Sequence, residues 1–213
     1  MKCESEKMMS EKQPHVVVFD IGRVLVKWRI AGLYEKLIPD ADRLEWFLRE
    51  VVSEEWHAQH DAGKPFAEMI EELCAQYPEE RELIELYAPR WLECVPGPIE
   101  GTHDIVRALD ARGVPLYSIT NFGVDAWAMF RPTFPVLDHF RDIVVSGHER
   151  MIKPHAAIFD LAAQRFGHAP DEMLFIDDNA DNIATARALG WHVHHFVDGA
   201  EALEADLRGR GLL

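Results

Sequence analysis

The feature that most constrains the fold is a short apolar run that ends in a carboxylate. Residues 15–19 read His-Val-Val-Val-Phe, and Asp20, Ile21 and Gly22 follow directly. A strand that is apolar at successive positions, and not only at alternate ones, is covered on both faces, which is typical of parallel sheets flanked by helices. Ligands of such sheets bind beyond the carboxyl ends of the strands. The run therefore predicts an α/β fold with a doubly wound parallel sheet and places Asp20 at the edge where ligands bind.

Asp20 alone has two interpretations, because aspartate is common at turns and helix starts as well as in active sites. A second apolar run, residues 174–176, ends in Asp177 and Asp178. Two buried strands that bring three carboxylates to one edge would repel each other unless a cation lies between them. A site made only of oxygen ligands suits Mg²⁺. The two runs together favour a magnesium site over a structural cap.

Four short segments follow one another along the chain: Phe-Asp-Ile-Gly-Arg-Val-Leu at 19–25, Ser-Ile-Thr-Asn at 118–121, Lys-Pro at 153–154 and Phe-Ile-Asp-Asp-Asn at 175–179. In order and spacing they resemble the motifs of the haloacid dehalogenase superfamily of aspartate-nucleophile hydrolases, most of which are Mg²⁺-dependent phosphatases. The Asp-x-Gly opening and the run Asp-Asp-Asn-Ala-Asp-Asn at 177–182 are most similar to the branch that contains α-D-glucose-1-phosphate phosphatase.

The resemblance implies a Rossmann-like core with the strand order 5-4-1-2-3 and an inserted α-helical cap. The sequence agrees with this, because apolar residues recur with a helical period from about residue 30 to residue 94 and no strand-like alternation interrupts them. We expect a core formed by residues 15–29 and 97–213, a cap of four or five helices formed by residues 30–96, and a flexible tail formed by residues 1–14.

The segment Val95-Pro96-Gly97-Pro98 marks the return from cap to core. Two prolines around a glycine are expected neither to continue a helix nor to join a sheet, and we predict the hinge there. Beyond it strands alternate with helices, which gives a parallel sheet with right-handed crossovers. The further predicted strands are residues 114–119, 143–146, 173–176 and 192–197.

The resemblance also implies a role for each motif residue. Asp20 would be the nucleophile that attacks phosphorus to form an aspartyl-phosphate, with its second carboxylate oxygen on Mg²⁺. Asp178 would be the second protein ligand, and Asp177 would ligate the ion or hold a water bound to it. Gly22 would offer its carbonyl oxygen to the metal. The alternative for Asp177 and Asp178 is a capping pair for the helix that follows.

Three further residues would bind the phosphoryl group: Thr120, Asn121 through its backbone, and Lys153. The lysine would place a cation beside Asp20 and offset charge as the transition state forms. The predicted catalytic set is therefore Asp20, Thr120 and Lys153. Taken alone, a Thr-Asn pair after a strand is more often a turn, and a single lysine is usually exposed. These assignments depend on the register of the four motifs.

Gly22 departs from the usual pattern of the family. Most phosphatases of the superfamily carry a second aspartate at this position, which protonates the leaving oxygen and later activates water. Loss of such an acid or base typically costs about 10²–10⁴-fold in rate. We expect either a substrate whose leaving oxygen is already acidic, such as a sugar 1-phosphate or an acyl phosphate, or a proton from a cap residue such as His57 or His60. The cap residues that could contact the leaving group are Trp28, Arg29, Trp56, His57, His60 and Asp61.

Two other functions are compatible with the sequence. The dehalogenases of the superfamily also lack that aspartate, because halide leaves without protonation, so the chain could be a 2-haloacid dehalogenase with Asp20 as nucleophile. Against this, Asp177 and Asp178 would repel a haloacid carboxylate, and Arg49 is not clearly in register with the arginine that binds this group in dehalogenases. The third function is a protein with this fold and little turnover, which Gly22 permits.

The charge and the cysteines restrict the partners. The formal net charge of −15 at pH 7 would repel nucleic acids and anionic lipid surfaces. The three cysteines form no Cys-x-x-Cys pair, so neither a disulfide framework nor a zinc site is indicated, and the first residues lack the apolar core of a signal peptide. We expect a cytoplasmic protein, monomeric or homodimeric, whose partner is a small phosphate ester and not nucleic acid or membrane.

Overall fold

The computed structural model describes residues 13–213 and contains a five-stranded parallel sheet. Its strands are β1 (Val16–Phe19), β4 (Leu116–Thr120), β5 (Asp142–Val145), β6 (Met173–Asp177) and β7 (His192–His195). They lie in the order β5-β4-β1-β6-β7. Along the chain, β1, β4, β5, β6 and β7 are the first to fifth strands of this sheet. Read from the edge at β7, their order is therefore 5-4-1-2-3, as predicted. The prediction of a doubly wound α/β fold is confirmed.

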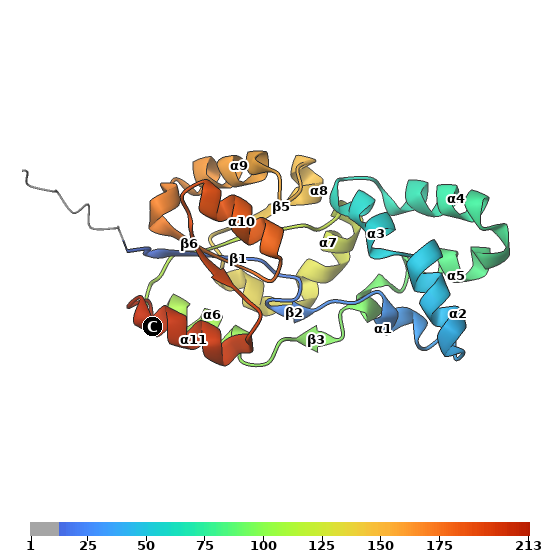
Figure 1. Cartoon of the computed structure of the whole chain (residues 1–213), viewed down its shortest axis with the longest axis horizontal. Helices are drawn as coiled ribbons and strands as arrows, with labels where there is room; N and C mark the ends of the chain where they lie inside the picture. Colours follow the sequence, from blue (N-terminus) through green and yellow to red (C-terminus); the bar gives the residue numbers. More distant parts are fainter. Residues whose placement is uncertain (1–12) are drawn as a thin grey trace, which may run out of the picture.

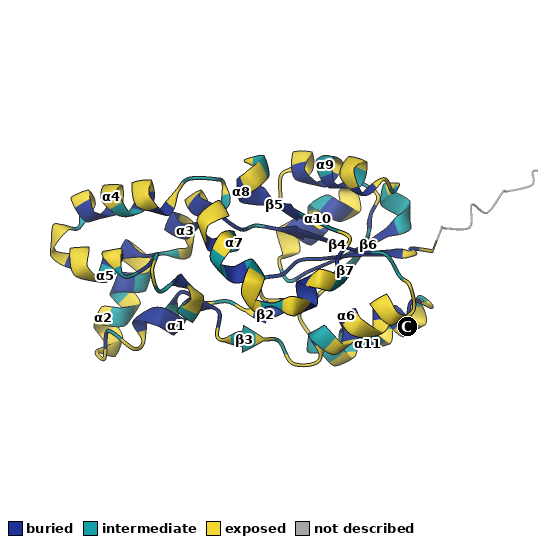
Figure 2. Ribbon diagram, turned by 180° about the vertical axis from the view of Figure 1, so that it is seen from behind, coloured by how far each residue is buried: buried dark blue, intermediate teal, exposed yellow. Residues whose placement is uncertain are grey.

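Helices cover both faces of this sheet. They are α6 (Thr102–Ala111), α7 (Val124–Phe130), α8 (Ser146–Glu149), α9 (Ala156–Phe166), α10 (Ala180–Ala188) and α11 (Gly199–Gly209), with 3₁₀ turns at Arg131–Thr133, Pro135–His139 and Pro170–Glu172. Helices α9 and α10 lie on one face, and α6 and α11 lie on the other (Figure 1). In β1, Val16 and Val18 belong to the apolar cluster that includes α9, whereas Val17 and Phe19 belong to the cluster that includes α11. All four side chains are buried, which explains why the strand lacks polar alternation. The neighbouring strands β4 and β6 are buried in the same way (Figure 2).

Between the first strand and α6 lies a helical segment beside the sheet (Figure 1). Its elements are α1 (Ala31–Tyr34), α2 (Ala41–Trp46), a π-helical turn (Phe47–Val51), α3 (Glu54–Asp61), α4 (Phe66–Gln76), α5 (Arg81–Glu85) and 3₁₀ turns at Pro78–Glu80 and Trp91–Cys94. Ser53 begins α3, because its Oγ accepts a hydrogen bond from the N–H of Trp56 at 3.0 Å. The buried side chains of this segment and of one face of the sheet form one continuous cluster. The division into a core and a cap of residues 30–96 therefore stays a prediction.

Two short strands connect the helical segment to the sheet. β2 (Val26–Lys27) and β3 (Gly97–Pro98) pair in antiparallel fashion. This corrects the expectation that residues 95–98 join no sheet. The two strands form a separate ribbon with no wider ladder, and proline is tolerated in such an edge position. The chain thus leaves and re-enters the region of the sheet through two adjacent segments.

The end of α3 docks onto the loop after β4 and onto the first turns of α7 and α8. The His60 ring lies so close to Gly123 that a Cβ atom at this glycine would be 2.0 Å from it. The N–H of Ala126 donates to His60 Nε2 at 3.3 Å. The hydroxyl of Ser146 donates to the carbonyl oxygen of Asp61 at 2.6 Å. These contacts fix the end of α3 next to the carboxyl ends of the strands.

Residues 1–12 lie outside the described part of the chain, and with them most of the predicted flexible tail of residues 1–14. Within residues 13–213, the helices are too short or too polar for any of them to cross a membrane. Cys74 and Cys94 are buried free cysteines.

Candidate active site

A pocket of about 150 Å³ lies where the carboxyl ends of the central strands face α3 and the strand pair β2–β3. The predicted site residues that line it are Asp20, Gly22, Asn121, Lys153 and Asp178. Thr120 and Asp177 are fully buried and do not contribute to its wall. The strand order therefore brings all four sequence motifs to one edge of the sheet.

Asp20 lies at the end of β1, beside the end of β6. Its N–H donates to the carbonyl oxygen of Ile176 at 2.8 Å, which extends the pairing of these strands beyond Phe19. Burial raises the pKa of the Asp20 carboxyl to about 7; the ammonium of Lys153 opposes this rise, and the charge of Asp177 adds to it. A cation next to Asp20 would therefore favour the ionised form, which is the nucleophilic one.

Lys153 bridges the ends of β1 and β6. Its Nζ lies 3.0 Å from Asp20 Oδ1 and 2.6 Å from Asp177 Oδ2. Burial alone would lower the pKa of Lys153, but the charges of Asp177 and Asp20 and their hydrogen bonds reverse this and raise it. The ammonium group is therefore charged at neutral pH although it is buried.

Asp177 uses both of its oxygens in hydrogen bonds. In addition to Lys153, it accepts from the N–H of Asn179 at 2.8 Å and from Asn182 Nδ2 at 3.0 Å. Asn179 also caps α10, because its Oδ1 accepts from the N–H groups of Asp181 and Asn182. The cap of this helix is thus Asn179, and neither Asp177 nor Asp178 takes that role.

Asp20, Asp177 and Asp178 form a group with the geometry of a metal site. One oxygen from each of the three carboxylates lies within 4.8 Å of the others. Burial and the charge of Asp177 raise the pKa of Asp178, while Arg23 and Lys153 oppose this rise. Three carboxylates face the single ammonium of Lys153, and a divalent cation would offset the remaining repulsion. The donors are all oxygen atoms, which fits Mg²⁺.

The loop after β4 contributes Thr120 and Asn121. Asn121 Oδ1 accepts from the N–H of Lys153 at 2.8 Å, and Asn121 Nδ2 donates to the Lys153 carbonyl oxygen at 3.0 Å. These two bonds tie the loop to the backbone of the lysine. Thr120 Oγ1, like Ser118 Oγ in the same strand, is buried without a hydrogen-bond partner among residues 13–213. The Thr120 hydroxyl thus has no partner but does not reach the pocket wall, and its predicted role in binding a phosphoryl oxygen stays a prediction.

Three of the six cap residues considered from the sequence line the pocket, namely Trp28, His57 and Asp61. Arg29, Trp56 and His60 do not. His57 is buried, and its Nδ1 shares a hydrogen bond of 2.8 Å with the hydroxyl of Tyr87. Burial, together with nearby His60, lowers the pKa of His57 to about 3.

His60 is also unsuited to donate a proton. Its Nδ1 lies 2.7 Å from the carbonyl oxygen of Lys64, its Nε2 accepts from Ala126, and burial lowers its pKa. The expectation that His57 or His60 protonates the leaving oxygen does not hold, because a neutral imidazole is a very weak acid and His60 is turned away from the pocket.

Asp61 is the last residue of α3, and its carboxyl shares the pocket with Asp20. Its Oδ1 lies 3.6 Å from Nε2 of the neutral His57, and it forms no ion pair with a lysine or arginine of residues 13–213. Burial raises the pKa of Asp61 to about 7; the backbone of Gly123 opposes this rise, Asp20 adds to it and Lys153 opposes it. The pocket thus contains a further carboxyl, partly buried, on the side of α3.

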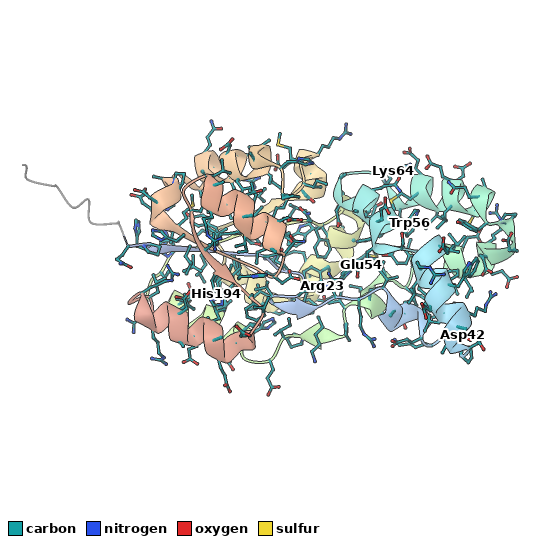
Figure 3. The ribbon with its side chains drawn as sticks, in the orientation of Figure 1. Arg23, Asp42, Glu54, Trp56, Lys64 and His194 are labelled. Carbon is teal, nitrogen blue, oxygen red and sulfur yellow. The ribbon has the colours of Figure 1, made fainter. Side chains whose placement is uncertain are left out.

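The sequence interpretation missed Arg23, Trp91 and Phe122, which also line the pocket. Arg23 has a left-handed backbone with φ of 58°, places its guanidinium 5.1 Å from the centre of the Trp28 ring, and pairs with Glu54 (Figure 3). Its position directly after Gly22 in the first motif was a usable signal, as was that of Phe122 after the second motif. Trp91 carries no such signal, because a short 3₁₀ turn has no periodicity to read.

Arg49, the arginine considered for a dehalogenase, lies outside the pocket. Its side chain is exposed and pairs with Glu45 and Glu50. It therefore provides no charge for a haloacid carboxylate at this pocket.

Comparison with known proteins gives the same assignment of fold. The model of the haloacid dehalogenase-like hydrolases matches residues 14–190. Phosphoglycolate phosphatase of Escherichia coli is 32% identical over 87 residues, which cover 41% of this chain and 34% of that protein. The matching stretch thus spans about a third of the length of this relative.

Solved structures resemble nearly the whole chain. A HAD-like family hydrolase from Porphyromonas gingivalis has a TM-score of 0.72 at 23% identity, covering 92% of this chain and 99% of that one. A magnesium complex of a HAD family enzyme from Bacteroides thetaiotaomicron has a TM-score of 0.68 at 21% identity, covering 90% and 99%. L-2-haloacid dehalogenase from Xanthobacter autotrophicus has a TM-score of 0.62 at 18% identity, covering 94% and 84%. At these identities the likeness shows the fold alone.

Proposed function

The chain belongs to the haloacid dehalogenase-like hydrolases, and from this premise we propose that it is a Mg²⁺-dependent phosphohydrolase that cleaves a small phosphate ester through an aspartyl-phosphate on Asp20. One observation carries the proposal: Asp20 and Asp178 lie close enough to share an ion, and Asp20 also touches the buried ammonium of Lys153. A nucleophile, a metal site and a fixed cation at one point are the requirements of phosphoryl transfer.

We assign the ion to Asp20, Asp178 and the carbonyl oxygen of Gly22. When bound, Mg²⁺ supplies positive charge to the phosphoryl oxygens and holds the nucleophile ionised. Asp177 was expected as a direct ligand or as the holder of a bound water. Because both of its oxygens already accept hydrogen bonds, we propose that it acts by fixing Lys153.

The residues of the chain then divide the reaction between them. The free carboxylate oxygen of Asp20 attacks phosphorus, and the leaving oxygen departs on the opposite side. Lys153, anchored between Asp20 and Asp177, stabilises the charge that develops on the phosphoryl oxygens. Thr120 Oγ1 and the backbone of Asn121 donate to the same oxygens. Water then attacks the aspartyl-phosphate, releases phosphate and restores Asp20.

We propose a sugar phosphate as the substrate class. The pocket is small and combines the flat rings of Trp28 and Trp91 with polar groups, which suits a compact polar ester. The motif similarity to the branch of α-D-glucose-1-phosphate phosphatase supports the same class. The name of the Escherichia coli relative, phosphoglycolate phosphatase, points to another small phosphate ester. A cytoplasmic location and a monomeric or homodimeric state stay predictions from the sequence.

A 2-haloacid dehalogenase is the second candidate, because a dehalogenase with chloropropionic acid covalently bound shares the fold. Two features of the site disfavour it. Asp177 and Asp178 crowd the nucleophile with negative charge, and Arg49 lies outside the pocket.

A paired assay tests these functions. Phosphate release is measured from a panel of sugar phosphates with and without Mg²⁺, and chloride release is measured from 2-chloropropionate, with Asp20→Asn as the control. We expect Mg²⁺-dependent phosphate release that Asp20→Asn abolishes, and no chloride. Chloride release without Mg²⁺ would establish the dehalogenase instead. A thermal shift with Mg²⁺ and beryllium fluoride, but no phosphate release, would indicate the fold without turnover.

A further inference from the structure

We propose that Asp61, carried into the pocket by α3, is the general acid and base that replaces the aspartate missing at Gly22. It would protonate the oxygen of the leaving alcohol in the first step and take a proton from the attacking water in the second. This assignment rests on the proposed phosphohydrolase function and extends it to the leaving-group side.

The shape of the site supports the assignment. Gly22 lines the pocket, and a Cβ atom added there would meet no atom within 4 Å. A side chain could therefore start from this position without a clash at its Cβ atom. Asp61 lines the same pocket from the opposite element, so an ester whose phosphoryl group is held at Asp20 presents its leaving oxygen towards the cap. Of the cap residues that line this pocket, Asp61 is the one with a carboxyl group.

Two contacts at the end of α3 fix the position of the Asp61 backbone. Ser146 donates to the carbonyl oxygen of Asp61 at 2.6 Å, and the next-to-last residue of α3, His60, is wedged against Gly123. Both contacts join α3 to the segments that directly follow β4 and β5. The carboxyl of Asp61 is therefore held relative to Asp20 by the same docking that closes the pocket, which is what a positioned acid requires.

The surroundings of Asp61 leave its proton available. The titratable groups that act on it are His57 on the same helix, Tyr87 behind His57, and Asp20 and Lys153 at the strand ends. Burial raises the pKa of Asp61 to about 7. An acid with a pKa near the working pH can both give and accept a proton efficiently.

The chemistry balances over two steps. In the first, an oxygen of Asp20 forms a bond to phosphorus while the bond from phosphorus to the ester oxygen breaks, and that oxygen takes the proton of Asp61 to leave as the alcohol. In the second, the Asp61 carboxylate takes a proton from water, whose oxygen bonds to phosphorus while the bond to Asp20 breaks. Inorganic phosphate leaves, Asp20 is again a carboxylate and Asp61 is again protonated.

The test compares Asp61→Asn with the wild-type protein on two esters in the presence of Mg²⁺. One is 4-nitrophenyl phosphate, whose leaving group needs no proton, and the other is the alkyl phosphate of the sugar panel that the wild-type protein hydrolyses fastest. On the alkyl ester we expect kcat to fall by about 10²–10⁴-fold. On 4-nitrophenyl phosphate we expect a rapid first release of nitrophenol, one for each active site, followed by slow turnover as the aspartyl-phosphate accumulates.

Two further variants sharpen the test. Gly22→Asp in the Asp61→Asn background places an acid at the position where most phosphatases of the family carry one. On the alkyl ester, kcat of this double variant should be at least about tenfold higher than kcat of Asp61→Asn. Asp42→Asn changes an exposed aspartate of the cap (Figure 3) and should leave both rates unchanged. The melting temperature of each variant shows that it is folded.

Asp61 is not the acid if Asp61→Asn hydrolyses the alkyl ester within about threefold of the wild-type rate, or if the first turnover falls equally on both esters. Failure of the underlying function has a different signature. In that case the wild-type protein releases no phosphate with Mg²⁺ from any ester, and Asp20→Asn behaves like it.

Discussion

The two ends of the pocket are built in opposite ways. At the strand ends the buried charges are paired, because Lys153 Nζ lies 3.0 Å from Asp20 and 2.6 Å from Asp177. At the other end, Asp61 faces His57 at 3.6 Å, and the pKa of about 3 for this histidine means that its ring is neutral at pH 7. One end is an ion-pair network, and the other is a partly buried acid whose neighbours, the backbone of Gly123 and the ring of His57, form no ion pair with it.

The difference predicts opposite effects of mutation on stability. Loss of a charge from the group formed by Asp20, Lys153 and Asp177 should destabilise the fold, whereas loss of the Asp61 charge should not. Removing one member of a buried ion pair is strongly destabilising, because the charge of the other member is left buried and uncompensated. A lone buried carboxyl does the opposite when it ionises, since desolvation is not offset. Proteins retain such groups where the chemistry needs them. The two ends should therefore respond with opposite signs to mutation.

The largest effect on stability is expected for Lys153→Met. The variant leaves Asp20 and Asp177 buried together without a cation, and breaking a buried pair in this way costs about 3–5 kcal/mol. Unfolding in urea measures the change in the free energy of unfolding. Lys36→Met, which removes an exposed lysine paired with Glu93, is the control and should have a far smaller effect. A Lys153→Met protein as stable as the wild type would show that the network does not hold the strand ends together.

Mg²⁺ is expected to have the next largest effect, and only at the strand ends. An ion that binds the folded state alone raises the free energy of unfolding by about 2.7 kcal/mol at one hundred times its Kd. Thermal unfolding with Mg²⁺ and with EDTA measures this shift. Asp178→Asn should abolish it, whereas Asp61→Asn should keep it, because the cap carboxyl is not a ligand. An equal loss in both variants would place the ion between the two ends of the pocket.

The sequence predicted the strand ends well, for physical reasons that did not extend to the cap. Apolar runs that end in acids identify buried parallel strands, and parallel strands deliver their carboxyl ends to one edge. Asp20, Asp178 and Lys153 were therefore found together. The different surroundings of Asp177 and Asp178 could not be predicted from the sequence, because only burial and hydrogen bonds distinguish two adjacent aspartates. Asp177 is buried against Lys153, whereas Asp178 lines the pocket.

The cap end depends on tertiary contacts that leave little trace in a single sequence. Asp61 reaches the pocket because His60 packs on Gly123 and because Ser146 binds the backbone of α3. The spacing of these residues in the sequence does not predict this contact. The sequence analysis considered His57 and His60 as proton donors, but burial lowers their pKa values and raises the pKa of Asp61. The same desolvation acts in opposite directions on a base and on an acid.

The difference in stability between the wild type and Asp61→Asn should depend on pH, because the wild-type carboxyl loses stability when it ionises in the fold. The pKa of Asp61 rises from 3.8 in the unfolded chain to about 7 in the fold, so between these values the folded state binds more protons. Stability contributed by this group is complete below pH 3.8, falls as the pH rises and is lost above about 7. The asparagine side chain of the variant cannot ionise, so the variant should match the wild type at pH 4 and exceed it in stability at pH 8, by on the order of 2–4 kcal/mol. Thermal unfolding of both proteins across this range measures the difference. A constant difference in melting temperature would mean that Asp61 ionises normally.

The smallest effect is expected at the junction between the two ends, where Arg23 pairs with Glu54 of α3. Their side chains are 43% and 59% exposed, so water screens the pair, and exposed pairs typically contribute about 0.2–1 kcal/mol. A double-mutant cycle of Arg23→Ala and Glu54→Ala, followed by urea unfolding, measures the coupling. We expect a value within that range, because α3 is held by its contacts with Gly123, Ala126 and Ser146 and not by this bridge. A coupling above about 1.5 kcal/mol would instead make the bridge a main attachment of α3. The pair of Arg23 and Glu54 would then resemble the ion pairs of Lys153 at the strand ends more than the surroundings of Asp61.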